Sequence, residues 1–482
     1  MTEVARTYEE RLVKYKSLVK ASKFIQGKNI CVRDSPIPLP RGAPPDHPRF
    51  LVDTKSQRVY FATARRLKEK HDKDSMDGEA HVICFLDGHV SDYRSCPVGG
   101  VYAAIKVMPL TVAEAGSPGD PEKPAWREIE ILRMCTDLVV RGVCPNLPVY
   151  YAHTVCNSTD PGTFQNTNIT KHYDSQAKVD QIRDLVEQVE KLADSLAHLK
   201  VFINLRDELL DDTDAIGETL ERYYASGKQY STSSVLIINE LCHFDFRNHM
   251  FNISLKLTSH PTALLLKVID TYILQVLIGL RALNNRGVIH FDLHLGNLLV
   301  TLLSVSQDPK SLQVMWWHYR IEGTDYYVPY YDSIVKLWDF GRSVILPRDR
   351  TLAAAKAVKT GKRFFGKYYT RYHKQIAANL TSGVDRFDRY VPLLQSFDTH
   401  RFIEQTLHSI SKVPVQPGFI KLTARMERMS RLAKDDITSG LRGSAPKSKG
   451  NPLQLIHTFY ADFARPPPAG ARIANEKKPY II

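Results

Sequence analysis

The sequence predicts an α+β protein in which strand-like runs come first and helical stripes dominate later. Apolar runs typical of strands lie at Tyr102–Met108 and Val235–Leu241. Apolar residues then recur at helical spacing from Leu266 to Leu283, and a helical pattern returns beyond Asp398 to about Leu441. A loop rich in polar residue types joins the first helical stripe to a short apolar run.

This loop, Gly287–Val300, contains His290, Asp292 and Asn297. Four residues separate Asp292 from Asn297, so one loop could aim a carboxylate at a substrate hydroxyl and an amide oxygen at a metal. A second motif, Asp339-Phe340-Gly341, ends a strand-like run, where a carboxylate could hold Mg²⁺ against ATP phosphates. Taken alone, the loop could equally be a turn braced by polar side chains.

Two charged residues upstream complete an order of motifs. Lys106 lies in the run Tyr102–Met108, and Glu128 lies near the start of a helix-like segment. Lys, Glu, catalytic loop and Asp-Phe-Gly follow one another as in the eukaryotic-type protein kinase superfamily, which the chain resembles from about residue 74 to 410. The resemblance implies a bilobal protein-kinase-like fold with insertions, a small β-rich N-lobe and a larger, mainly helical C-lobe.

The resemblance also implies ATP and Mg²⁺ as cofactors and a role for each motif residue. Lys106 would bind the α- and β-phosphates, and Glu128 would hold Lys106 in place. Asp292 would be the catalytic base, which accepts the proton of the attacking hydroxyl. Asn297 and Asp339 would be the metal ligands. Phosphoryl transfer depends mainly on positioning and charge neutralisation, which these residue types supply.

Other positions would support the site. His290 would buttress the Asp-Phe-Gly turn, and Asp398, near the start of the central helix of the large lobe, would accept N–H bonds from the catalytic loop. Val235–Leu241 resembles the strand that runs into the adenine hinge, which puts Glu240 among the nucleotide-binding residues and Asn239 at the gatekeeper position.

The chain departs from the family pattern in two places. The expected glycine-rich loop, Ser75–Val82, holds only Gly78 where three glycines are usual, although Val82 begins a strand-like run. Glycine allows the backbone to approach phosphates closely, so this loop weakens the expectation of ATP binding. Phe291 replaces the Arg that usually precedes the catalytic Asp, which implies regulation other than by activation-loop phosphorylation.

Two further features indicate which groups of kinases and phosphotransferases the chain resembles. His294 follows Asp292 by two positions, as in aminoglycoside and choline phosphotransferases. However, Asn297 and Asp339 are 42 positions apart, and the intervening residues predict an extra β-hairpin at about 302–334. A similar loop and long hairpin occur in haspin-like kinases and in serine/threonine kinases of large DNA viruses. The viral type implies the cytoplasm of an infected host cell, and virions, as the location.

We expect four regions. Residues 1–73 form an accessory region with an N-terminal helix and a Pro-rich linker. The N-lobe spans 74–242 and carries a helical insertion at about 157–232, whose apolar stripe either packs on its own lobe or docks a partner. The C-lobe spans 243–441, and 442–482 form a flexible tail.

Charge and cysteine content limit the classes of partner and metal that we expect. The net charge is +13, and twelve Lys or Arg lie between Gly341 and Tyr390 against three Asp. This basic tract predicts acidic or pre-phosphorylated protein substrates, or is simply a solvated face. Aromatic residues there fit a core face as well as a stacking platform, and nucleic acid is not the expected partner. Seven Cys without metal-ligand spacing predict reduced thiols and no zinc. No signal peptide or membrane span is expected.

The sequence therefore predicts a serine/threonine protein kinase that transfers the γ-phosphate of Mg-ATP to protein hydroxyls. Two alternatives stay open. The poor glycine loop is also typical of a pseudokinase scaffold, and His294 is also typical of a small-molecule phosphotransferase.

Overall fold

The structure is a computed structural model. It describes residues 8–22, 30–34, 49–53, 59–66, 79–85, 101–157, 188, 230–259, 263–302, 315–331, 333–365, 384–410, 417–441, 447–475 and 478–482. The expected insertion at 157–232, the Pro-rich linker and Gly78 lie wholly or almost wholly outside these residues.

The helices and strands of the N-terminal part are α1 (Tyr8–Ser22), β1 (Ile30–Asp34), β2 (Arg49–Asp53), β3 (Val59–Arg66), β4 (Glu79–Phe85), β5 (Val101–Thr111), α2 (Val112–Gly116), α3 (Pro124–Val140), β6 (Tyr150–Cys156) and β7 (Tyr230–Asn239). Those that follow are β8 (Phe244–Asp245), α7 (Phe246–Ser259), α8 (Ala263–Asn284), β9 (Val288–Ile289), η3 (Leu295–Asn297), β10 (Leu298–Leu302), β11 (Met315–Ile321), β12 (Thr324–Tyr330), β13 (Ser333–Leu337), β14 (Val344–Ile345), α9 (Arg350–Phe365), α11 (Val384–Ile410), α12 (Pro417–Leu441), α13 (Pro452–Phe459), η6 (Ala461–Ala464), β15 (Arg472–Ile473) and β16 (Tyr480–Ile481).

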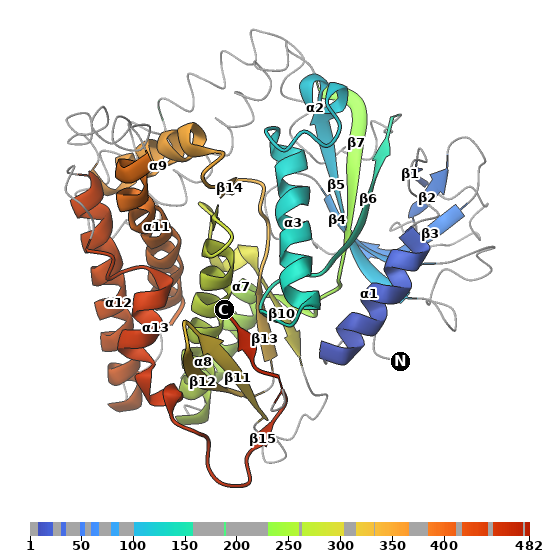
Figure 1. Cartoon of the computed structure of the whole chain (residues 1–482). Helices are drawn as coiled ribbons and strands as arrows, with labels where there is room; N and C mark the ends of the chain where they lie inside the picture. The colour runs from blue at the N-terminus through green and yellow to red at the C-terminus, as the bar shows by residue number, and fades with distance from the viewer. Residues whose placement is uncertain are drawn as a thin grey trace.

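Strands and helices are largely segregated, so the α+β class is confirmed. The strands β1 to β7 form one antiparallel sheet in the order β1-β2-β3-β4-β5-β7-β6. Helix α3 lies along this sheet, and the long helices α8, α11 and α12 lie on the other side of the molecule (Figure 1). The strands β10 and β13 lie between α3 and the helices α11 and α12 in Figure 1.

Helix α8 forms the centre of the helical part. Its side chains from Val268 to Leu283 are almost all buried, as expected for a helix that is apolar on most faces. The helix has 22 residues, and its most apolar window has a mean hydropathy of 1.8, so by length and composition alone it could cross a membrane. Because 67% of that window is buried inside the protein, the helix fits a core position equally well, and the expected absence of a membrane span stays a prediction.

The predicted hairpin between Asn297 and Asp339 is confirmed as β11 and β12. These strands pair in register from Met315↔Tyr330 to Ile321↔Thr324. Glu322 and Gly323 connect them with φ of 46° and 84°, as required by the tight turn that matches strand twist.

Two expectations about the helical part were wrong. Asp398 lies in the middle of α11 rather than near its start, because the helix continues through Pro392. The tail expected at 442–482 is folded over its described residues: α13 packs on α8, and β15 and β16 pair with β11. Buried Leu455, Ile456 and Tyr460 explain this ordering, because they add apolar surface to the core.

The cysteines also differ from expectation. Cys135, Cys144 and Cys242 are free thiols, but Cys156 is disulfide-bonded. A disulfide depends on the distance between two Cβ atoms, which spacing in the sequence does not reveal.

Candidate active site

The structure brings Lys106 and Glu128 together. Lys106 lies on β5, and its Nζ donates to both carboxylate oxygens of Glu128, at 3.0 and 3.2 Å. Glu128 is almost fully buried on α3, whose first residue is Pro124, a residue favoured at this position because its φ is preset for a helix. The expected Lys–Glu pair is therefore formed across 22 positions of sequence.

Asp339 completes this charge cluster from the other part of the molecule. It follows β13, and its Oδ1 accepts a hydrogen bond from Lys106 Nζ at 2.9 Å. Its φ is +60°, a left-handed conformation that is costly for a residue other than glycine and is often found at functional sites. Burial alone would raise the pKa of Asp339, but the Lys106 ammonium outweighs it and the pKa is lowered.

The loop Gly287–Val300 places Asn297 against Asp292. Asn297 Nδ2 donates to the backbone oxygen of Asp292 at 2.9 Å and to its Oδ2 at 3.2 Å. His294 caps the one-turn helix η3 by accepting from the Gly296 N–H, which fixes the path of the chain into β10. Loop residues five apart are thus held face to face by local hydrogen bonds.

Two arginines surround the carboxylate of Asp292. Arg401 of α11 lies 3.1 Å from Asp292 Oδ1, and Arg342, just after Asp-Phe-Gly, lies 3.8 Å from the same oxygen. Burial would raise the pKa of Asp292, but the two guanidinium groups, with His294 and His290, lower it well below the usual range. Asp292 is therefore a carboxylate at neutral pH.

His290 and Asp398 buttress the loop from behind, as expected. His290 Nε2 bonds to the backbone oxygen of Trp338 at 2.8 Å, and its ring contacts Phe340 with centroids 5.2 Å apart. Asp398 Oδ2 accepts from the His290 N–H at 2.8 Å, and the Phe291 N–H also bonds to this carboxyl. Burial raises the pKa of Asp398 to about 6 despite these bonds.

The donor set fits Mg²⁺ with substrate phosphates. The Trp338 N–H donates to the backbone oxygen of Asn297 at 2.9 Å. The chain segments that carry Asn297 and Asp339 therefore lie side by side. Asn297 uses its amide nitrogen as a donor to Asp292, which leaves its amide oxygen for a ligand. Among the described residues, no three His, Cys, Asp or Glu side chains gather as a metal site. Mg²⁺ commonly takes only one or two protein ligands when phosphates and water supply the rest.

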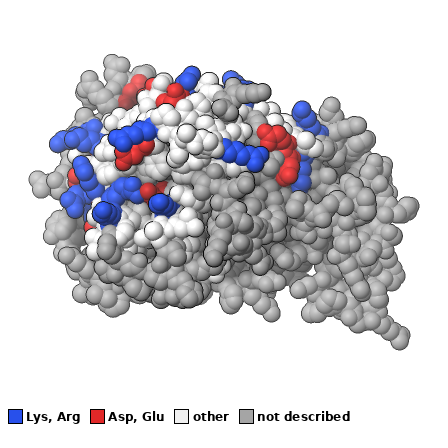
Figure 2. All heavy atoms as spheres, turned by 90° about the horizontal axis from the view of Figure 1, so that it is seen from below, with Lys and Arg blue, Asp and Glu red and all other residues white. Residues whose placement is uncertain are grey.

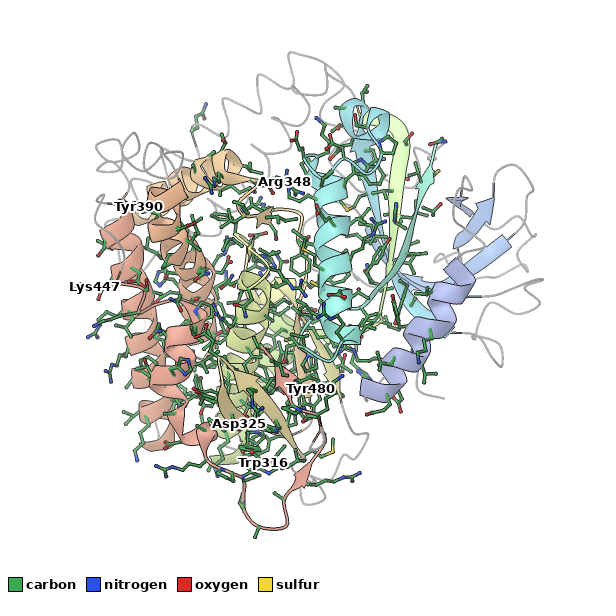
Figure 3. All side chains as sticks on the ribbon, viewed as in Figure 1. Trp316, Asp325, Arg348, Tyr390, Lys447 and Tyr480 are labelled. Carbon is green, nitrogen blue, oxygen red and sulfur yellow. The ribbon has the colours of Figure 1, made fainter. Side chains whose placement is uncertain are left out.

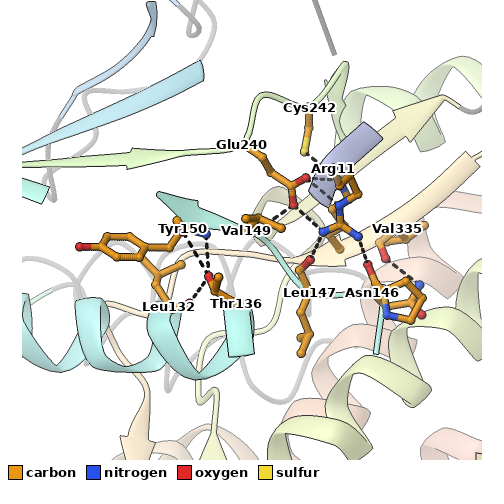
Figure 4. A network of polar contacts seen from close by, with 12 residues as sticks. Arg11, Leu132, Thr136, Asn146, Leu147, Val149, Tyr150, Glu240, Cys242 and Val335 are labelled. Atoms are coloured by element: carbon orange, nitrogen blue, oxygen red, sulfur yellow. Dashed lines mark hydrogen bonds and ion pairs between the residues drawn. The ribbon is translucent and has the colours of Figure 1, made fainter. Parts of the chain in front are cut away.

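Glu240 directly follows β7, as expected, but its side chain is bound within the protein. Its carboxylate accepts from Arg11 Nε at 2.9 Å and Nη2 at 2.7 Å, from Lys336 Nζ at 2.9 Å and from the Val149 N–H at 2.8 Å (Figure 4). Glu240 directly follows β7, and successive side chains of a strand alternate between its faces. The side chain therefore points away from Lys106. The Glu240 N–H donates to the backbone oxygen of Val149 at 2.8 Å, so the contact left for a nucleotide is the backbone oxygen of Glu240.

The Arg11–Glu240–Lys336 network is buried throughout. Arg11 also donates to the backbone oxygens of Pro145 and Leu147, at 2.8 and 2.6 Å. Burial would raise the pKa of Glu240, but Arg11 and Lys336 outweigh it and the pKa is lowered. Helix α1, expected only as an accessory helix, is thus tied to the end of β7.

The remaining expected nucleotide residues are described only in part. Val82 lies on β4 in register with Ala104, two residues before Lys106. Gly78 falls in the connection between β3 and β4, outside the described residues.

The described cations of the basic tract are engaged within the protein. Arg342 contacts Asp292, while Arg348 binds Glu130 of α3 at 2.8 Å and Asp349 at 3.1 Å. Arg348 accordingly lies toward α3 in Figure 3. Seen from below, the helical end of the molecule carries Lys and Arg groups with Asp and Glu groups among them (Figure 2). The formal excess of the tract therefore overstates the free positive charge of its described part.

The sequence reasoning missed Arg11, Lys336 and Arg401. Arg401 could have been found, because it follows Asp398 by three positions, which puts it one helical turn farther along the helix that supports the loop. Arg11 and Lys336 carry no local signal, since their partner Glu240 is distant in sequence.

No model of a protein family matches the chain. The chain is similar to the uncharacterized protein C717R of African swine fever virus. For the isolates Tick/South Africa/Pretoriuskop and Warthog/Namibia, identity is 24% over 268 residues, which cover 51% of this chain and 34% of the viral protein. For the Badajoz strain, identity is 23% over 268 residues. The chain spans about a third of the length of these relatives, whose name assigns no activity.

Proposed function

We propose that this protein is an ATP-dependent serine/threonine protein kinase with a bilobal kinase fold, of the type encoded by large DNA viruses. The observation that carries the proposal is the contact of Lys106 Nζ with both Glu128 and Asp339, beside the Asn297–Asp292 pair. These residues come from four separate segments and were selected from sequence order alone. The similarity to viral proteins supports the viral type.

Lys106 has a definite task in this reaction. An ammonium group has three donors, and Glu128 and Asp339 orient it toward the space between the two parts of the chain. Two oxygens of Glu128 and one of Asp339 already accept from Lys106 Nζ, so a phosphate oxygen of the nucleotide would take the place of one of them. Because the buried Glu128 already accepts from Lys106 without nucleotide, Lys106 is positioned before the nucleotide arrives.

Asp292 would receive the substrate hydroxyl. Its lowered pKa keeps it ionised, so it can accept the hydroxyl hydrogen bond and aim the oxygen at the γ-phosphorus. Asn297 and Arg401 fix the direction of the carboxylate. When bound through Asn297 and Asp339, Mg²⁺ would supply neutralisation of phosphate charge.

The test is phosphoryl transfer from γ-labelled Mg-ATP to an acidic and a basic model protein. Asp292→Asn should abolish label on Ser and Thr, while Asp462→Asn, which changes an exposed carboxylate far from the site, should leave it unchanged. Preference for the acidic protein would support the predicted substrate class.

Other outcomes would point to other functions. Label that persists in Asp292→Asn contradicts the proposal. Mg-ATP binding without any transfer would instead fit a scaffold, and label found only on a small-molecule acceptor would fit a metabolite phosphotransferase.

A further inference from the structure

Asn239, the last residue of β7, is a buried amide without partners. Its side chain is fully buried, and neither Oδ1 nor Nδ2 has a hydrogen-bond partner. Asn is uncommon in strands and is seldom fully buried, because an unpaired buried polar group is costly. The position therefore calls for a specific physical reason.

Elsewhere the same protein satisfies a buried amide completely. Asn146 donates to Gln275, Tyr330 and the Val335 backbone oxygen, and its Oδ1 accepts from Tyr319. Both amides are almost wholly inaccessible to solvent, so they differ in their hydrogen bonding and not in their burial. Asn146 stabilises the fold through its hydrogen bonds, whereas the amide of Asn239 has an unpaired donor and an unpaired acceptor.

Strand register puts Asn239 on the same face as Lys106. Asn239 pairs with Ala104 across β5 and β7, and Lys106 pairs with Ile237. Directly opposed residues share a face of a sheet, as do residues two apart on one strand. Asn239 thus lies on the face whose lysine contacts Glu128 and Asp339, about 7 Å along the strand from the Lys106 pair.

The residue that follows Asn239 fixes the position of the amide. Glu240, the next residue, is anchored on the opposite face by Arg11 and Lys336, which holds the end of β7 in place. Ala104, which pairs with Asn239 across the strands, is partly exposed, whereas the two amide atoms of Asn239 are covered. A ligand lying on Ala104 would therefore reach the amide once the side chains that cover it move aside.

We propose that Asn239 reads the base of the bound nucleotide by pairing its amide with N6 and N7 of adenine, which selects ATP over GTP. Adenine presents a donor at N6 and an acceptor at N7, which match Oδ1 and Nδ2. Guanine presents acceptors at both O6 and N7, so Oδ1 would face another acceptor. The inference rests on the proposed function, because it takes Lys106 as the phosphate-binding residue.

The experiment measures binding of Mg-ATP, Mg-GTP and Mg-7-deaza-ATP by calorimetry to the full chain. Wild type should bind ATP about tenfold or more tightly than GTP, and 7-deaza-ATP, which lacks the N7 acceptor, should bind more weakly than ATP. Asn239→Leu should lower ATP affinity by a similar factor and bind ATP and 7-deaza-ATP equally. Asn252→Leu, which changes an exposed amide on α7, should behave as wild type.

Thermal unfolding without nucleotide provides a second readout. If the amide is unpaired in the free protein, Asn239→Leu should leave the Tm unchanged or raise it, because an apolar side chain removes an unsatisfied group. A lowered Tm together with unchanged nucleotide selectivity would mean that a buried water alone satisfies the amide, and would overturn the inference. Equal loss with 7-deaza-ATP in wild type and Asn239→Leu would overturn it as well. If the wild type binds no nucleotide, both the proposed function and the base-reading role of Asn239 are refuted. If Asn239→Leu binds ATP with unchanged selectivity over GTP, only the base-reading role is refuted.

Discussion

Arg11 and Glu240 lie 229 positions apart in the sequence and meet in a buried ion pair, with Arg11 Nη2 2.7 Å from Glu240 Oε1. Both side chains are almost inaccessible, and Lys336 binds the same carboxylate. Removal of one partner from a buried charge network leaves the others without compensation, which costs far more than the pair gains over an apolar replacement. Three segments distant in sequence therefore depend on one another at this point.

Arg11→Met should lower the free energy of unfolding by about 3 kcal/mol, because Glu240 then keeps only Lys336 as a charged partner and two backbone oxygens lose a donor. Chemical denaturation measures the change. Arg141→Met removes an exposed pair with Asp137 and should cost less than about 1 kcal/mol. Equal effects of the two substitutions would contradict the buried network.

Arg401 positions Asp292 without touching nucleotide in the proposed kinase. Arg401→Met should lower kcat by about 10- to 100-fold and leave the KM for ATP unchanged, since a misdirected carboxylate affects transfer rather than nucleotide binding. Arg401→Lys should recover part of kcat. Arg431→Met, at an exposed position of α12, serves as control. A raised KM for ATP with normal kcat would rule out this role.

Asp398 gives the stability a distinct pH dependence. Its folded-state pKa of about 6 lies above the ordinary Asp value of about 3.9. Between these values the folded state holds a proton that the unfolded chain releases, so this group favours folding at low pH. That contribution is lost as the pH rises through 6.

Asp398→Asn removes this titration. The stability of Asp398→Asn relative to wild type should therefore rise by about 2 to 3 kcal/mol between pH 4 and pH 7. Denaturation of both proteins across that range measures it. A constant difference would show that Asp398 titrates normally. The comparison isolates one group, because every other carboxylate is common to both proteins.

The described part of 442–482 should contribute to stability as an ordinary core segment. Leu455 is fully buried on α13, so Leu455→Ala should cost about 3 kcal/mol. Ile420→Ala on α12 removes a side chain that is 52% exposed and should cost less than about 1 kcal/mol. Urea denaturation compares the two variants. Equal small effects would restore the interpretation as a flexible tail.

The candidate site was predictable because its motifs are short and their order is informative. Asp292 and Asn297 occupy one loop. Lys106 lies within a strand, and Glu128 lies in the first turns of the helix that comes next in the motif order, so local pattern is enough to pair them. Arg401 was missed, although helical spacing from Asp398 would have placed it near the loop. Arg11 was not predictable, because a single Arg in a charged helix does not indicate which distant carboxylate it meets.

The start of α11 and the fold of the residues after 442 were predicted wrongly from proline, glycine and serine content. Pro392 favours a helix start after it, because proline lacks the backbone donor of a helix interior, yet α11 runs through it. The Pro466–Pro468 run and the Gly and Ser residues near 443–450 favour a disordered tail. The short apolar stripe that contains Leu455 and Ile456 outweighs them, because it is buried against α8.

Gly287 provides the sharpest test of the packing beneath the catalytic loop. Its φ is +74°, and a Cβ added there would lie 2.3 Å from the backbone oxygen of Leu346. The two segments cannot simply separate, because the Leu346 N–H donates to the Gly287 oxygen at 2.8 Å and β9 pairs with β14 alongside. Gly287→Ala therefore combines a backbone clash with left-handed strain.

Gly323 is the matched control, since its φ is +84° and an added Cβ meets nothing within 4 Å. Gly323→Ala should cost about 1 kcal/mol from backbone strain alone. Gly287→Ala should cost about 3 kcal/mol or more and should lower any transferase activity, because His290 and Asp292 follow directly on β9. Equilibrium denaturation of both variants separates strain from clash: if Gly287→Ala costs no more than Gly323→Ala, the close contact with Leu346 does not exist in solution.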